Sequence, residues 1–334
     1  MNADEYILEK LISKGAFGQV YLGSKIGSQR KYAIKKKELS KYLKNEKAKK
    51  FLDNEILIMK DINHPNIIKI LDVKMNKKFV FIITEYCNGG NLEEFLEKYL
   101  ETNNKALSEE IVQHIMRQII EVFRYLYNKK IMHRHINLRH ILINYENDED
   151  REKNDIMKGK IKLINFEFAR YLKKGELAKS ILGSPLTMSP IILNKLNKKE
   201  DYQDTEYDEK EDIWSLGIIC YELLIGKNPF DSDAMSELVN KINKGEYSIP
   251  TTLSKDAISF LNCMIKFYPQ QRLNVDELYN HDFLRKNVKD FNKFDIYIIK
   301  KYEHDSKIKI NTKNDELIRK ILFKPIFNSK NKEN

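Results

Sequence analysis

The chain has 334 residues, of which 42% are hydrophobic, which is enough to bury a sizeable core in one large or two medium domains. Its formal net charge of +10 is spread along the whole chain, and no basic stripe with interleaved aromatic residues indicates nucleic-acid binding. The three cysteines (Cys87, Cys220 and Cys263) are an odd count without metal-ligand spacing, so they favour a reducing compartment over a disulfide framework.

Two stretches bear on targeting. The N-terminal sequence MNADEYILEK has no basic segment followed by an apolar run, so we expect no secretory signal. The longest apolar stretch, residues 213–226, is too short and too polar to span a bilayer, and it predicts a buried core helix. Together these features predict a cytoplasmic protein without a membrane span.

The first part of the chain is predicted to form strands. Two short runs flank a glycine-rich turn within residues 6–26, and RKYAIKKK (30–37) is a third, alternating strand. A charged helix is expected from about Leu39 to Asp61, and its apolar stripe comprises Phe51, Leu52, Ile56 and Met59. Strands at 67–73 and 78–86 follow, and CNGG (87–90) is typical of a flexible, hinge-like break.

The pattern beyond Asn91 is helical. Residues 92–100 and 108–130 predict helices, and Ser108 with Glu110 and Ile111 makes a plausible helix start. Residues 144–159 read as a solvated insertion between strands, and 198–212 as another polar stretch. The tail after Leu284 is rich in lysine and asparagine but holds amphipathic pieces.

This order of strands, hinge and helices, with the motifs described below, resembles the eukaryotic protein kinase family from roughly Tyr6 to Leu284. TEYCNGGNLEEFL, FARYL, GSPLTMSP and DIWSLG are most similar to the autophagy-initiating ULK-type Ser/Thr kinases. The resemblance implies an α+β, bilobal protein kinase fold, with an antiparallel N-lobe sheet carrying one major helix and a mostly helical C-lobe. We expect an N-terminal extension (1–5), a kinase-like domain (6–284; N-lobe 6–86, hinge 85–90, C-lobe 91–284) and a partly helical tail (285–334).

A nucleotide site is implied by the same resemblance. The glycine-rich loop, whose backbone amides lie over the phosphates in the family, reads Ser13-x-Gly15-x-x-Gly18-x-Val20, so serine replaces the first glycine. Lys35 matches the lysine that contacts the α- and β-phosphates, and Glu55 matches its ion-pair partner. The remaining matches are the adenine-facing Val20, Ala33 and Leu142, the gatekeeper Thr84, and the hinge backbone from Glu85 to Cys87.

The catalytic positions depart from the family. His135 replaces the aspartate that accepts the substrate proton, and Asn137 replaces the lysine that steadies the γ-phosphate. His140 replaces a magnesium-holding asparagine, and Asn165, in NFE, replaces the metal-chelating aspartate of DFG. Phosphoryl transfer depends on charge neutralisation by the metal, and magnesium favours anionic oxygen ligands. We therefore expect no magnesium site and no phosphotransfer.

Three alternatives would preserve some of the catalytic chemistry. His135 could accept a proton at neutral pH. Glu167, which replaces the DFG glycine, could act as a substitute metal ligand. His135, His140 and Asn165 could hold a softer transition metal, although histidines near one another are more often ordinary polar residues.

Framework residues also match the family. Met59, Ile70, His133 and Phe166 match a hydrophobic stack that ties the lobes together, and Asp212 matches its buried anchor. SPI replaces APE, so Ile191 removes the usual partner of Arg272, which must find another partner or face solvent. Arg134 could pair with a phosphate in the segment that holds Ser180, Ser184, Thr187 and Ser189, or it only braces this loop.

Three interpretations of function follow from the resemblance. The first is a pseudokinase, a kinase-fold binding and scaffolding module in signalling that engages a protein partner, such as an active kinase or a signalling complex, and takes ATP without magnesium. The second is an active Ser/Thr kinase with unorthodox metal use. The third is a purely structural kinase fold with an empty cleft.

Overall fold

The computed structural model describes the chain except at residues 1, 4, 16–17, 172–183, 199–207 and 286–334. The described residues fall into two compact units. One comprises those within Met1–Asp61 and Lys69–Tyr86, and the other those within Ile62–Ile68 and Cys87–Ile299. Ser180 and almost all of the expected tail lie outside the described residues.

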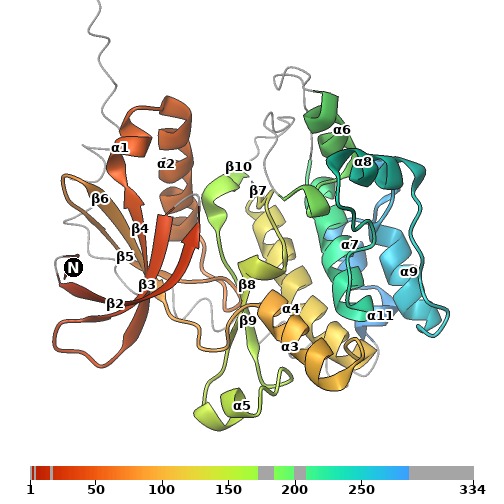
Figure 1. Ribbon diagram of the computed structural model, residues 1–334, viewed down its shortest axis with the longest axis horizontal. Coiled ribbons are helices and arrows are strands. Elements are labelled where there is room, and N and C mark those ends of the chain that lie inside the picture. Colours follow the sequence, from red (N-terminus) through yellow and green to blue (C-terminus); the bar gives the residue numbers. More distant parts are fainter. Residues whose placement is uncertain (1, 4, 16–17, 172–183, 199–207, 286–334) are drawn as a thin grey trace, which may run out of the picture. The chain divides into compact units, whose positions relative to one another are not determined.

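The first unit is built on a six-stranded antiparallel sheet (Figure 1). Its strands, in spatial order, are β1 (Asn2–Ala3), β2 (Tyr6–Gly15), β3 (Gly18–Lys25), β4 (Lys31–Glu38), β6 (Phe79–Glu85) and β5 (Ile70–Met75). Successive side chains of a strand point to opposite faces. On one face Tyr32 and Ile34 of β4 pack in a buried cluster with Tyr6, Leu8, Phe81 and Ile83. Lys35 and Lys37 therefore point to the opposite face.

The expected helix from Leu39 to Asp61 is wrong in one respect, because the structure has two helices there. These are α1 (Leu39–Leu43) and α2 (Glu46–Asp61). Asn45 lies between them, and its side chain accepts a hydrogen bond from Ala48 N at 3.1 Å. A side-chain oxygen at this position satisfies a free amide of the first turn, so α2 starts anew here. The apolar stripe of α2 is confirmed, since Leu52, Ile56 and Met59 are buried.

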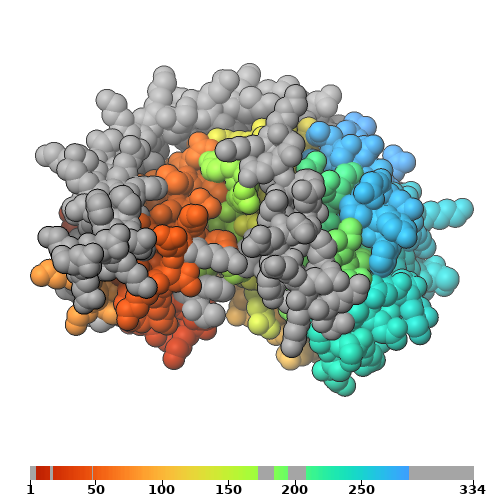
Figure 2. Space-filling view, turned by 90° about the horizontal axis from the view of Figure 1, so that it is seen from above, coloured from red at the N-terminus to blue at the C-terminus, as the bar shows by residue number. Residues whose placement is uncertain are grey.

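The second unit is mostly helical. Its helices are α3 (Leu92–Asn103), α4 (Glu109–Asn128), α5 (Asp148–Glu152), α6 (Pro190–Lys198), α7 (Lys210–Ile225), α8 (Met235–Lys244), α9 (Lys255–Met264), α10 (Val275–Tyr279) and α11 (Asp282–Arg285). Two short antiparallel pairs join β7 (Ile131–Met132) to β10 (Arg170–Tyr171) and β8 (Ile141–Asn144) to β9 (Lys160–Leu163). Single 3₁₀ turns are η1 (Leu138–His140), η2 (Phe166–Phe168), η3 (Pro185–Thr187) and η5 (Pro269–Gln271). In the space-filling view, α8 to α11 form a continuous surface that runs from green-cyan to blue (Figure 2). The α+β fold class is thus confirmed.

Several local predictions have clear outcomes in this unit. Ser108 caps α4, since its hydroxyl accepts a hydrogen bond from Ile111 N at 3.4 Å. The apolar stretch at 213–226 is confirmed as the buried core helix α7. The insertion at 144–159 is less solvated than expected, because it contains α5 and buries Tyr145 and Ile156. Within the described ranges, no helix has the length and apolar character needed to cross a bilayer.

Candidate functional site

Strand register brings several predicted nucleotide-binding residues together in the first unit. Ser13 lies opposite Val20, and Val20 lies opposite Lys35. Ala33, two residues before Lys35, lies opposite Thr84, whose hydroxyl is 3.4 Å from the Ala33 carbonyl oxygen. Since directly opposed residues share a face and alternate residues return to it, these side chains gather on one face of the sheet. Glu85 follows Thr84 and is the last residue of β6.

The glycine-rich turn joins β2 to β3, with Gly15 paired to Gly18 at its base. Gly18 has a φ of +135°, and a Cβ placed there would lie 2.5 Å from the Lys36 carbonyl oxygen. A side chain at 18 would therefore be strained and would collide with backbone. A Cβ at Gly15 would meet no atom within 4 Å, so packing does not require glycine at this position.

One glutamate of α2 is held by two lysines of β4. Lys35 Nζ donates to Glu55 Oε1 at 2.7 Å, and Lys37 Nζ donates to Glu55 Oε2 at 2.6 Å. Burial raises the pKa of Glu55, but the charges of Lys35 and Lys37 outweigh it and hold the pKa well below its usual range. The expected pairing of Lys35 with Glu55 is present, and Lys37 is an additional partner that the sequence analysis missed.

Two predicted nucleotide positions, Cys87 and Leu142, belong to the second unit. Leu142 lies on β8 and forms an isolated bridge with Asn91. The residues after Cys87 are tied to the same strand, with Gly89 N donating to the Ile143 carbonyl oxygen at 2.9 Å. A Cβ at Gly89 would lie 2.8 Å from that oxygen, so glycine is needed here. The segment expected to be flexible is therefore hydrogen-bonded to β8.

The loop that begins at His133 is anchored by Asp212. This buried carboxylate accepts hydrogen bonds from His133 N at 3.0 Å and from Arg134 N at 2.8 Å. Arg134 has a φ of 64°, a left-handed conformation that a side-chain acceptor helps to hold. The Arg134 guanidinium Nε donates to the Phe168 carbonyl oxygen at 2.6 Å, which agrees with a bracing role. The His133 ring meets Phe166 edge-on, with ring centroids 5.1 Å apart.

His135, His140 and Asn165 come together in this unit. His140 Nδ1 lies 2.7 Å from the His135 carbonyl oxygen, and His140 Nε2 lies 3.0 Å from Asn165 Nδ2. A carbonyl oxygen only accepts, so Nδ1 carries the proton and Nε2 accepts from the Asn165 amide. Both nitrogens of His140 thus have hydrogen-bond partners.

The His135 ring packs on His140, with centroids 4.5 Å apart, and on Phe168 at 5.1 Å. Burial, with a further contribution from His140, lowers the pKa of His135 to about 3. His135 is therefore neutral at pH 7 and a weak base. Asn137 joins the group through the backbone only, since its carbonyl oxygen accepts from His140 N at 3.1 Å. Glu167 is buried in η2.

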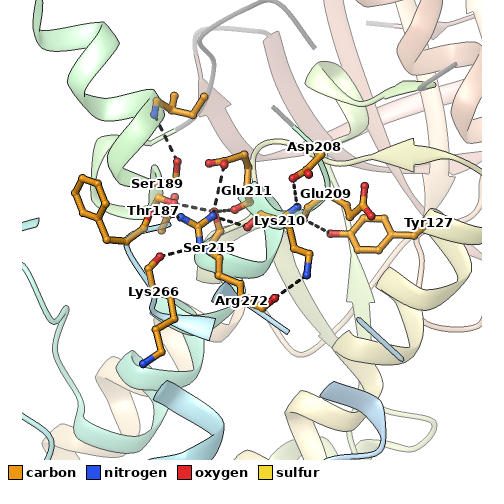
Figure 3. A network of polar contacts seen from close by, with 12 residues as sticks. Tyr127, Thr187, Ser189, Asp208, Glu209, Lys210, Glu211, Ser215, Lys266 and Arg272 are labelled. Atoms are coloured by element: carbon orange, nitrogen blue, oxygen red, sulfur yellow. Dashed lines mark hydrogen bonds and ion pairs between the residues drawn. The ribbon is translucent and has the colours of Figure 1, made fainter. Parts of the chain in front are cut away.

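Arg272 is buried, with 2% of its surface exposed, so the expectation that it could face solvent is wrong. The alternative expectation, that it finds another partner, is confirmed. Its guanidinium Nη1 lies 3.5 Å from Glu211 Oε1 in the first turn of α7 and donates to the Lys210 carbonyl oxygen at 2.7 Å (Figure 3). The guanidinium also lies over the Trp214 ring, 5.2 Å from its centroid.

Glu211 also interacts with the segment that precedes α6. Burial raises the pKa of Glu211, whereas Arg272 and the side chain of Ser189, two residues before Ile191, oppose this shift. Nearby, the Ser215 hydroxyl donates to the Thr187 carbonyl oxygen at 2.7 Å (Figure 3). An acidic residue directly before Asp212 was the available sequence signal for this partner.

Comparison with known proteins gives a consistent picture. Residues 6–284 match the protein kinase domain family. The serine/threonine-protein kinase atg1 of Dictyostelium discoideum is 31% identical over 290 residues, which cover 86% of this chain and 40% of that protein. The human serine/threonine-protein kinase ULK1 is 30% identical over 287 residues, covering 84% of this chain and 25% of that protein.

A further relative is the serine/threonine-protein kinase 36 of Mus musculus. It is 33% identical over 286 residues, covering 85% of this chain and 20% of that protein. The chain thus spans between a fifth and two fifths of the length of these curated relatives.

Proposed function

The chain belongs to the protein kinase domain family and is related to ULK/Atg1-type Ser/Thr kinases, and from this premise we propose that it is a catalytically inactive member. In this proposal it is a binding module that takes ATP without magnesium and acts by engaging a protein partner. The observation that carries the proposal is the hydrogen bond between His140 and Asn165.

Magnesium does not fit the side chains at the two metal-binding positions. Magnesium prefers anionic oxygen ligands in octahedral geometry, and neither Asn165 nor His140 has an anionic side chain. The His140 ring nitrogen that could bind a metal accepts from the Asn165 amide instead. A transition metal is disfavoured for the same reason, and the described residues contain no cluster of three His, Cys, Asp or Glu side chains that could hold a metal.

Proton transfer at His135 is also weakly supported. A general base works best when its pKa lies near the operating pH, and burial lowers the pKa of His135 to about 3. Loss of a positioned base typically slows a reaction by about 10²–10⁴-fold. Together with the missing metal ligands, this supports a rate of phosphotransfer at background level.

Nucleotide binding is supported by the first unit alone. Gly15 is paired with Gly18, and Gly18 has a φ of +135°. Lys35 is held by Glu55 on the face of the sheet that also carries Val20 and Ala33. An ammonium group attracts a polyphosphate with or without magnesium, and removing anionic metal ligands lessens repulsion against the bare phosphates. We therefore expect this site to bind ATP in the absence of magnesium.

The decisive experiment measures two properties on one preparation. Phosphotransfer is assayed with ATP and a panel of magnesium, manganese and zinc concentrations, with a Lys35→Met variant as the control for contaminating kinases. ATP binding is measured by calorimetry, first in EDTA and then in excess magnesium. We expect no Lys35-dependent phosphotransfer and similar ATP affinities in both buffers.

A second candidate function is an active Ser/Thr kinase. It is favoured by the formed ion pair between Lys35 and Glu55 and by relatives whose names describe kinases. Metal-dependent phosphotransfer that disappears in Lys35→Met would establish it and reject the proposal. Absence of ATP binding in both buffers would instead indicate that the kinase fold of this protein does not bind nucleotide.

A further inference from the structure

A chain of side-chain amides fixes the segment Ile62–Ile68 within the second unit. In sequence this segment lies between two parts of the first unit, yet it belongs to the second. Asn66 is buried, and its Nδ2 donates to the Ile161 carbonyl oxygen of β9 at 2.9 Å and to Gln118 Oε1 of α4 at 2.8 Å. Ile161 N also donates to Gln118 Oε1, at 2.9 Å. Gln118 therefore clamps both the segment and β9 to α4.

A backbone group fixes the orientation of the Gln118 amide. Ile161 N can only donate, so its partner on Gln118 is the oxygen, and the other end of this amide is the NH₂ group. The NH₂ nitrogen lies 3.0 Å from His114 Nε2, one turn earlier in α4. An NH₂ group only donates, so this contact requires a His114 Nε2 that carries no proton.

His114 Nε2 also faces a partner of the opposite kind. The Gly159 carbonyl oxygen lies 3.5 Å from it and can only accept. Without a proton, Nε2 accepts from Gln118. With a proton, Nε2 donates to Gly159 and presents a second N–H group to the Gln118 NH₂. The shorter of the two distances, 3.0 Å, belongs to the contact of the unprotonated form.

Gln118 cannot adapt to a protonated His114 without losing its clamp. Rotating its amide by 180° would turn the oxygen toward His114. The NH₂ group would then face Ile161 N and Asn66 Nδ2, which are both donors. A buried donor that loses its acceptor is destabilising. Protonation of His114 and the clamp on the segment therefore exclude each other.

We infer that His114 is an acid-sensitive latch: its neutral ring holds Gln118 on the segment Ile62–Ile68 and β9, and its protonation turns Nε2 to Gly159 and releases the segment. Burial lowers the pKa of His114 below its ordinary value of 6.5, so the latch is closed at pH 7. The open form binds the proton more readily than the closed form. The closed form is thus fully favoured above pH 6.5 and loses stability as the pH falls.

The neighbouring charges modify this response but do not replace it. The charged and titratable residues on the surrounding elements are Glu110 and Arg117 of α4, Asp155 before β9, Lys160 and Lys162 of β9, and His64 of the segment. Burial has the largest effect on the pKa of His114, while Arg117 lowers it further and Asp155 raises it. Burial lowers the pKa of His64 to about 3, so His64 stays neutral at pH 5.

The protonation state is tested by ¹⁵N NMR of the full chain with labelled histidines, of which it has seven. The His114 signal is assigned by its loss in His114→Gln. We expect an unprotonated Nε2 at pH 7 and a titration with a pKa below the ordinary value of 6.5. A protonated Nε2 at pH 7, or a pKa at or above 6.5, would overturn the inference.

Release of the segment is tested by hydrogen exchange at pH 7 and pH 5, expressed as protection so that the intrinsic pH dependence of exchange is removed. The amides to follow are those of Ile161 and Leu163, which donate to Gln118 Oε1 and to the Asn66 carbonyl oxygen. Their protection should fall by about tenfold, and that of the buried amides of α7 should fall less. An equal fall at α7 would indicate global unfolding and reject the latch.

Three variants separate the latch from other effects of acid. His114→Gln keeps an acceptor for Gln118 without a titrating group, so the acid response of the Ile161 amide should disappear. Gln118→Glu offers a carboxylate to protonated His114, so this response should also disappear and the pKa of His114 should rise. His281→Gln is the matched control, because burial lowers the pKa of His281 too, and it should keep the full response.

Persistence of the response in His114→Gln, or its loss in His281→Gln, would contradict the latch. If His114→Gln does not fold, Gln118→Glu still decides, since a full acid response or an unchanged histidine titration in that variant rejects the inference.

Discussion

Arg272 pairs with Glu211, the residue directly before Asp212, and not with an acid at position 191. The kinase resemblance places an acid at 191, where this chain has isoleucine. Glu211 supplies this carboxylate from the first turn of α7 (Figure 3). In the same helix the Ser215 hydroxyl donates to the Thr187 carbonyl oxygen, so α7 contacts both Arg272 and the segment before α6.

Glu211→Gln should lower the free energy of unfolding by about 2–3 kcal/mol, because it leaves a buried guanidinium charge without its carboxylate. The backbone carbonyl oxygens of Lys266 and Lys210 still accept from Arg272, which limits the loss. Urea unfolding followed by Trp214 fluorescence measures the change. The matched control is Glu237→Gln on α8, an exposed pair with Lys241, which should cost less than about 1 kcal/mol. Equal effects of both substitutions would contradict a buried ion pair.

Acidification should destabilise the second unit through His135. Its pKa is about 3 in the folded protein and should return to about 6.5 in the unfolded chain. Between these values the unfolded state binds more protons, so stability is fully present above pH 6.5 and is lost as the pH falls toward 3. The slope is up to ~1.4 kcal/mol per pH unit. Unfolding in urea at pH 7, 6 and 5 measures it.

The control for this pH effect is His135→Asn, which removes the titrating ring. Its stability should fall less steeply on acidification than that of the unmodified protein. Part of the slope should remain, because burial also lowers the pKa values of His64 and His133 to about 3. Identical slopes for the two proteins would show that His135 does not titrate in this way.

Asn165→Asp combined with His140→Asn should create a magnesium requirement. The double variant replaces the hydrogen bond between Asn165 and His140 with a carboxylate and an amide, and magnesium prefers such oxygen ligands. ATP should raise the melting temperature of the variant more in magnesium than in EDTA, whereas the unmodified protein should respond equally. His140→Asn alone is the control and should not gain this dependence. A variant that remains indifferent to magnesium would refute our account of the metal positions.

Asp212→Asn should lower the free energy of unfolding by about 2–3 kcal/mol. The carboxylate accepts hydrogen bonds from two backbone N–H groups, one on each oxygen. Asparagine has only one side-chain oxygen, so one of these buried N–H groups would face the asparagine NH₂ group and lose its acceptor. The left-handed conformation of Arg134 also loses its support. Asp276→Asn, which changes an exposed partner of Arg124, is the control and should change stability by less than about 1 kcal/mol. A loss at Asp212 no greater than at Asp276 would argue against this anchoring.

Local signals in the sequence determined much of the fold. The order of strands and helices, the start of α4 at Ser108 and the buried character of α7 follow from periodicity and capping, which act over a few neighbouring residues. The break at Asn45 belongs to the same class of signal and was overlooked. The residue types at the catalytic positions are equally explicit, because a missing carboxylate at 165 or 135 is visible without coordinates.

Tertiary structure alone decided which of these groups meet. Arg272 and Glu211 are 61 residues apart, so no local pattern pairs them. Lys37 is the last of three consecutive lysines in KYAIKKKE, and only the packing of α2 against β4 buries it on Glu55. The hydrogen bond that satisfies His140 depends on a residue 25 positions later in the chain. Such contacts depend on how distant elements pack, because a buried charge or amide must find its partner within the space that the fold leaves.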